Sequence, residues 1–177
     1  ASLLTAAGGR TLALFTSYES LNAARDYLAS HVDLPVLCQG EMPERRLIEK
    51  FAATSEASLL ATRKFWQGID VPGQTLSLVV INRLPFPSPS EHLIKARSVG
   101  ANPLGWWKVE LPIGATRLAQ GAGRLIRRED DYGVVAVLDP RLATQTYRSE
   151  LLQALPPMRT TNDSKEVDRF LRNLDVR

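Results

Sequence analysis

The sequence has little of what metal sites, disulfides and membrane spans are built from. It contains one cysteine, Cys38, and two histidines, His31 and His92, among 177 residues. A single cysteine excludes an internal disulfide and any metal site made of several thiolates, and it fits a reducing cytoplasm. No apolar run approaches the roughly 18 to 20 residues that a membrane span needs. We therefore expect a cytoplasmic protein with no metal site of its own and no membrane association.

The first residues lack two further features. Residue 1 is alanine instead of an initiator methionine, and no signal pattern of basic, apolar and small residues follows it. Hydrophobic residues make up 44% of the chain and charged residues 23%, which is ordinary for a globular protein. The length corresponds to about one domain. We expect residues 1–177 to form a single domain that belongs to a longer protein.

Positive charge is concentrated in the middle of the chain. The net charge is only +3, but residues 63–128 hold ten of the 22 Lys and Arg residues and only three of the 19 Asp and Glu residues. A polyanion such as a nucleic acid or a nucleotide is a natural partner for such a stretch. A basic surface without a ligand has the same composition, so charge alone leaves both interpretations open.

Short apolar runs alternate with helical patterns, which predicts a parallel sheet covered by helices. The runs are nearly continuous in apolar residues, as in LSLVVI and GVVAVL, because parallel strands are buried on both faces. The predicted strands are residues 11–16, 35–38, 58–62, 76–82 and 133–139. The fold class is therefore α/β, a three-layer sandwich with a mostly parallel central sheet.

Helix signals fill most of the intervals between these runs. Ser17 is a plausible N-cap for the first helix, and three prolines within residues 84–89 predict a stiff loop at the end of the fourth strand. The predicted helices are residues 18–30, 43–53, 90–108 in short pieces, 112–127 and 165–174.

The predicted helix 112–127 carries a row of polar side chains. Arg117, Gln120, Arg124 and Arg127 are spaced so that they share one helical face, while apolar residues occupy another. The planar guanidinium group suits phosphate oxygens and can stabilise a γ-phosphoryl group during transfer. Taken alone, the row is more typical of the solvated basic face of a core helix.

A second candidate surface follows the third predicted strand. The loop TRKFWQGIDVPG, residues 62–73, lies beyond the carboxyl end of a parallel strand, where open α/β sheets bind ligands. Arg63 and Lys64 can hold phosphates, Gly68 allows close approach to the backbone, and Asp70 can accept a hydrogen bond from a ribose or orient an arginine. Each also has a purely structural explanation, such as packing or capping a turn.

Several segments together resemble the second motor domain of the DinG/XPD-like branch of superfamily two helicases. They are LFTSYESL (14–21), ATRKFWQGIDVPG (61–73), INRLPFPSPS (81–90) and QGAGRLIRRE (120–129). The resemblance is greatest to bacterial DinG and YoaA-type proteins and covers nearly the whole chain. It implies a RecA-like fold and a function in a bacterial, ATP-dependent DNA helicase that moves 5′ to 3′ and serves DNA repair.

The resemblance also implies roles for individual residues. The segment 120–127 matches helicase motif VI, in which Arg124 and Arg127 are arginine fingers that reach ATP, beside Gln120 and Gly123. In motif V, Gln67 stands where the family usually has glutamate, while the two residues that couple nucleotide to DNA are Gly68 and Asp70. The implied contacts with the backbone of single-stranded DNA are Thr16, Ser17, Thr62, Arg63 and Lys64.

Half of an ATP site is missing from the sequence. No G-x-x-x-x-G-K-[ST] phosphate loop is present. The resemblance therefore implies that ATP and Mg²⁺ are bound mainly by a first motor domain of the same polypeptide, and we expect the isolated chain to be inactive. The iron–sulphur cluster of many relatives also belongs to that first domain and not to this chain.

Two other classes of function stay open. A single-stranded nucleic-acid-binding module without catalysis fits the basic middle of the chain. A small-molecule α/β enzyme needs a nucleophile and a base in one cleft, and neither His31 nor His92 has a convincing nucleophile nearby in sequence. A steep loss of DNA affinity with salt would distinguish a phosphate-binding surface from such an enzyme.

Overall fold

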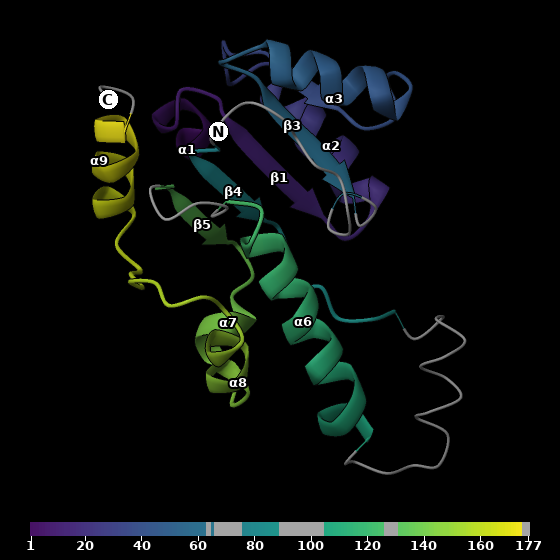
Figure 1. Ribbon diagram of the computed structural model, residues 1–177, viewed down its shortest axis with the longest axis vertical. Coiled ribbons are helices and arrows are strands. Elements are labelled where there is room, and N and C mark those ends of the chain that lie inside the picture. Colours follow the sequence, from purple (N-terminus) through teal and green to yellow (C-terminus); the bar gives the residue numbers. More distant parts are fainter. Residues whose placement is uncertain (63–64, 66–75, 89–104, 126–130, 175–177) are drawn as a thin grey trace.

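The computed structural model describes residues 1–62, 65, 76–88, 105–125 and 131–174. Its centre is a five-stranded sheet in which every pair of neighbours is parallel, in the order β2-β3-β1-β4-β5 (Figure 1). The strands are β1 (Thr11–Phe15), β2 (Val36–Cys38), β3 (Ser58–Thr62), β4 (Leu78–Ile81) and β5 (Val134–Val137). The five predicted strands and the parallel sheet are confirmed, although four of the strands are shorter than predicted.

Helices cover both faces of the sheet, so the predicted three layers are also confirmed. They are α1 (Ser2–Ala6), α2 (Tyr18–Leu28), α3 (Glu44–Ala53), the π-helix η2 (Trp106–Glu110), α6 (Leu111–Ala122), α7 (Arg141–Thr144), α8 (Arg148–Gln153) and α9 (Ser164–Leu174). Side chains of α1, α2 and α9 pack on one face, and those of α3, α6 and α8 pack on the other.

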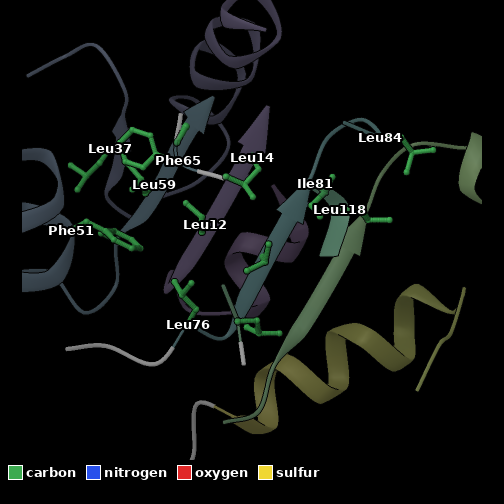
Figure 2. Packing of buried hydrophobic residues seen from close by; sticks show 14 of the residues in the cluster. Leu12, Leu14, Leu37, Phe51, Leu59, Phe65, Leu76, Ile81, Leu84 and Leu118 are labelled. Atoms are coloured by element: carbon green, nitrogen blue, oxygen red, sulfur yellow. The ribbon is translucent and has the colours of Figure 1, made fainter. Parts of the chain in front are cut away.

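Strand β1 shows how the two cores are separated. Leu12 and Leu14 point to the face covered by α3 and α6, while Ala13 and Phe15 point to the opposite face, because successive side chains of a strand alternate. Figure 2 shows Leu12 and Leu14 beside Leu59 of β3 in the first of these cores. Since both faces are buried, four of the five residues of the strand are apolar, and the one polar residue, Thr11, stands at its first position.

The amino edge of the sheet begins with a tight turn. Gly8, Gly9 and Arg10 all have positive φ, at 61°, 81° and 42°. A Cβ on Gly9 would lie only 1.8 Å from the carbonyl oxygen of Glu56. Glycine is therefore required at this position by space as well as by backbone conformation.

The helix that carries Gln120 differs from its prediction at both ends. It is preceded by η2, where the N–H of Leu111 donates to the carbonyl of Trp106, five residues earlier. Pro112 has no N–H to continue the ordinary pattern. At the other end, α6 stops at Ala122, and Arg124 and its neighbour continue in a turn with i→i−3 hydrogen bonds. Arg124 therefore lies just beyond the end of the helix, whereas the prediction of a helix to residue 127 places it inside.

Candidate functional site

Three neighbouring strands present polar residues at the carboxyl edge of the sheet. Thr16 and Ser17 follow β1, Thr62 ends β3, and Gln39 follows β2 directly. Because β2, β3 and β1 are adjacent and parallel, these residues lie in one row. Open parallel sheets bind ligands beyond this edge. The described residues predicted to contact DNA are thus brought together by the fold.

The side chain of Gln39 connects this row. Its Oε1 accepts a hydrogen bond from the backbone N–H of Thr62 at 2.6 Å and another from the Thr62 hydroxyl at 2.8 Å. Its Nε2 donates to the hydroxyl of Tyr18 at 2.9 Å. Thr62 is itself buried, with 7% exposure. Gln39 was not predicted, because nothing in the local sequence marks a glutamine that bonds to a residue 23 positions away.

Ser17 and Thr16 lie at the exposed end of the row. The Ser17 hydroxyl accepts a hydrogen bond from the backbone N–H of Ser20 at 3.2 Å, which confirms its predicted role as the N-cap of α2. A capping hydroxyl and the first N–H groups of a helix form a locally positive surface. These N–H groups can bind an anionic group, and the exposed carboxylate of Glu19 in the same turn opposes it.

The other half of the carboxyl edge is held by an ion pair. Asp139, which follows β5 and is 6% exposed, binds the Arg141 guanidinium at 2.6 Å and accepts the N–H of Leu84 at 2.9 Å. Burial would raise the pKa of Asp139, but hydrogen bonds from Arg141 and from the backbone outweigh it and lower the pKa to about 2. The pair thus fixes the loop after β4 to the end of β5.

That loop in turn fixes the first half of α6. Phe86 packs against Trp106 and Tyr147, with ring centroids 5.6 Å away in both cases, and Arg141 stacks over its ring. A Cβ on Gly114 of α6 would lie 2.5 Å from the Phe86 ring. The structure therefore places Trp106 in packing, while Trp107 is 43% exposed.

The turn that follows α6 reaches the opposite edge of the sheet. Leu125 packs where β4 and β5 begin, since a Cβ on Gly133 would meet both Leu125 Cδ1 and the carbonyl oxygen of Ser77 at 2.6 Å. Gln120, which precedes Gly123 in the chain, is exposed, and Arg124, which follows it, is half-buried. Arg124, next to Leu125, therefore lies toward the amino ends of the strands, whereas the described DNA-contact residues lie at the carboxyl ends of β1 and β3.

Five predicted site residues lie outside the described residues. They are Arg63, Lys64, Gly68, Asp70 and Arg127.

Reactive and metal-binding chemistry has little support in the described part of the chain. The Cys38 thiol is 1% exposed, and burial together with the nearby carboxylate of Glu41 raises its pKa to about 11. Within the described ranges, no group of three or more His, Cys, Asp and Glu side chains is arranged to hold a metal ion. None of the helices in these ranges is both long and apolar enough to span a bilayer.

Comparison with known proteins gives consistent matches. The family described as "Helicase C-terminal domain" matches residues 1–158. The chain is 47% identical to the ATP-dependent helicase DinG of Mycobacterium tuberculosis over 179 residues, which covers 98% of this chain and 27% of that protein. It is 40% identical to the ATP-dependent DNA helicase YoaA of Escherichia coli, covering 96% of this chain and 26% of that protein.

A solved structure of an XPD helicase has a similar fold. It superimposes with a TM-score of 0.62 at 22% sequence identity, covering 85% of this chain and 28% of that one. The chain spans about a quarter of the length of each of these proteins.

Proposed function

Since this chain belongs to the helicase C-terminal domain family of DinG, YoaA and XPD-type helicases, we propose that it is the second motor domain of an ATP-dependent DNA helicase. The observation that carries the proposal is the family match over residues 1–158, which includes the pattern Q-x-x-G-R at the end of α6. In this proposal, residues 1–177 are one RecA-like domain that works beside a first motor domain of the same polypeptide.

The amino edge of the sheet is the proposed nucleotide side. Arg124 and Arg127 approach the γ-phosphate of ATP that the first motor domain binds with Mg²⁺, and Gln120 and Gly123 lie beside them. A guanidinium group stabilises the charge that develops on the transferring phosphoryl group. Arg124 suits this task because it follows the helix in a turn and is only half-buried.

The carboxyl edge is the proposed DNA side. Thr16 and Ser17 are exposed there at the start of α2, where N–H groups and hydroxyls can bind phosphate oxygens. Arg63 and Lys64 follow the adjacent strand and add positive charge. Such contacts hold the sugar-phosphate backbone without reading base sequence, as a translocating motor requires.

Closure of two motor domains on ATP would couple these two sides. Gly68 and Asp70 belong to the segment that connects β3, whose end is at the DNA side, with β4, whose start is near Leu125. They are therefore suited to couple nucleotide and DNA. The direction of movement proposed from family resemblance is 5′ to 3′.

The test is the ATPase rate of the two-domain protein, with and without single-stranded DNA. Arg124→Ala should lower the DNA-stimulated rate by about a thousandfold, the usual contribution of an arginine finger, while DNA binding and folding are retained. Arg46→Ala on the exposed face of α3 removes the same charge far from α6 and should leave the rate unchanged. An equal rate in both variants would refute the proposed function and favour a non-catalytic binding module.

A further inference from the structure

We propose that Gln39 donates a hydrogen bond to a backbone phosphate of single-stranded DNA and so takes the place predicted for Thr62. This inference rests on the proposed function, because it names one contact of the proposed DNA side. It depends on how many hydrogen atoms the side chains of Gln39 and Thr62 can still donate to a phosphate oxygen.

The orientation of the Gln39 amide is fixed by its neighbours. A backbone N–H can only donate, so the Gln39 atom 2.6 Å from the nitrogen of Thr62 must be the oxygen. The amide nitrogen then faces the hydroxyl of Tyr18. The assignment of oxygen and nitrogen therefore follows from the hydrogen-bond pattern.

The hydroxyl of Thr62 has no hydrogen left for a phosphate. It carries one hydrogen, which it donates to Oε1 of Gln39 at 2.8 Å. A phosphate oxygen accepts hydrogen bonds and needs a donor. With 7% of its surface exposed, Thr62 also offers a ligand little access.

Gln39 has the donor that Thr62 lacks. Its amide nitrogen carries two hydrogens, of which Tyr18 accepts one; in the described part of the structure no acceptor is recorded for the second. The residue is only partly buried, at the carboxyl edge and in the same row as Ser17. Three hydrogen bonds already hold its side chain, so little conformational entropy remains to be lost when a ligand binds.

Glu41 defines one side of this contact. Glu41 is two residues after Gln39 and is exposed. Its carboxylate accepts a hydrogen bond from the backbone N–H of Cys38 at 3.2 Å. A carboxylate repels phosphate. The DNA backbone should therefore pass Gln39 at a distance from the carboxylate of Glu41.

The variant Gln39→Glu removes the hydrogen-bond donor and keeps the hydrogen bonds that hold the fold at this position. A carboxylate can accept both hydrogen bonds from Thr62 and one from the Tyr18 hydroxyl, so the network is preserved while the donor is lost and a negative charge is added. Gln153→Glu at the end of α8 makes the same chemical change on an exposed surface away from this edge. Gln39→Ala removes the donor without adding charge.

The experiment measures the Kd of a labelled oligothymidylate for the two-domain protein at low and high potassium chloride, with thermal unfolding of each variant. Gln39→Glu should raise Kd by about tenfold or more at low salt, and the effect should shrink at high salt because charge repulsion is screened. Gln39→Ala should raise Kd by about tenfold at both salt concentrations, the size of one hydrogen bond to a charged group. Gln153→Glu should bind as the unmodified protein does.

The outcomes separate the two proposals. If the unmodified protein binds DNA but all three folded variants bind equally well, Gln39 makes no contact and only this inference is overturned. If the unmodified protein fails to bind single-stranded DNA, the proposed function fails and the inference with it. If Gln39→Glu does not fold, the salt-independent loss expected for Gln39→Ala decides the question alone.

Discussion

At the amino edge of the sheet, backbone lies against backbone, whereas at the carboxyl edge polar side chains supply the hydrogen bonds that join the elements. Gly9 lies directly on the carbonyl of Glu56, and Gly133 lies on that of Ser77. At the other edge, Gln39 and Asp139 connect elements through hydrogen bonds of their side chains. The first edge depends on the absence of a side chain, which leaves no room for substitution. The second depends on polar groups that can also meet a ligand.

The largest effect is expected from filling the space at the amino edge. Gly9→Ala forces a Cβ into the carbonyl of Glu56 and places alanine at φ +81°. We expect it to lower the free energy of unfolding by more than about 3 kcal/mol. Gly40→Ala is a matched control: φ is +102°, but nothing lies within 4 Å of the new Cβ, so it should cost only about 1 kcal/mol. Equal losses in urea unfolding would mean that strain, not space, requires glycine at both positions.

A smaller effect is expected from the ion pair at the carboxyl edge. The folded-state pKa of Asp139, about 2, lies below its ordinary value of 3.8, so the pair stabilises the fold above about pH 4 and this contribution disappears as the pH falls to 2. Its size is on the order of 2 kcal/mol. Asp139→Asn should be less stable than the unmodified chain at pH 7.

Unfolding measured from pH 7 to pH 2 checks this sign. The difference between the unmodified chain and Asp139→Asn should shrink between pH 4 and pH 2. A difference that stays constant over this range would show that the carboxylate acts through shape and not through charge.

The smallest effect is expected for the chemical labelling of Cys38, the last residue of β2, which directly precedes Gln39. Its thiol is 1% exposed and has its pKa raised to about 11, so it should not react with iodoacetamide at pH 8 while the chain is folded. Gly9→Ala should speed this reaction because it destabilises the whole sheet. Fast labelling of the unmodified chain would show that the carboxyl edge opens locally.

The sheet was predictable because burial on both faces leaves a continuous apolar run in each strand. The ends of the strands were less accurate, since residues such as Thr16 and Asn82 continue the run in sequence but fall outside the described strands. The end of α6 was misplaced because an apolar pattern does not reveal where i→i−3 hydrogen bonds replace helical ones. The short helices α1, α7 and α8 were missed because four to six residues carry too little periodicity.

The candidate site divides in the same way. The cap at Ser17 was predicted because capping is local in sequence, whereas its contact with DNA was implied by the family resemblance and stays a prediction. Gln39 and the pair of Asp139 with Leu84 were not, since they join residues 23 and 55 positions apart. A role that depends on distant partners appears only when the chain is folded. The roles of Arg124 and Thr16 remain predictions.

Helix α6 and the turn after it run against the direction of the strands, from Gly114 beside the loop after β4 to Leu125 beside the start of β5. One continuous segment with backbone hydrogen bonds therefore links the two ends of the sheet. In the proposed motor, a displacement at the nucleotide side would reach the DNA side as a movement of this whole segment, and no rearrangement of side chains through the core would be needed.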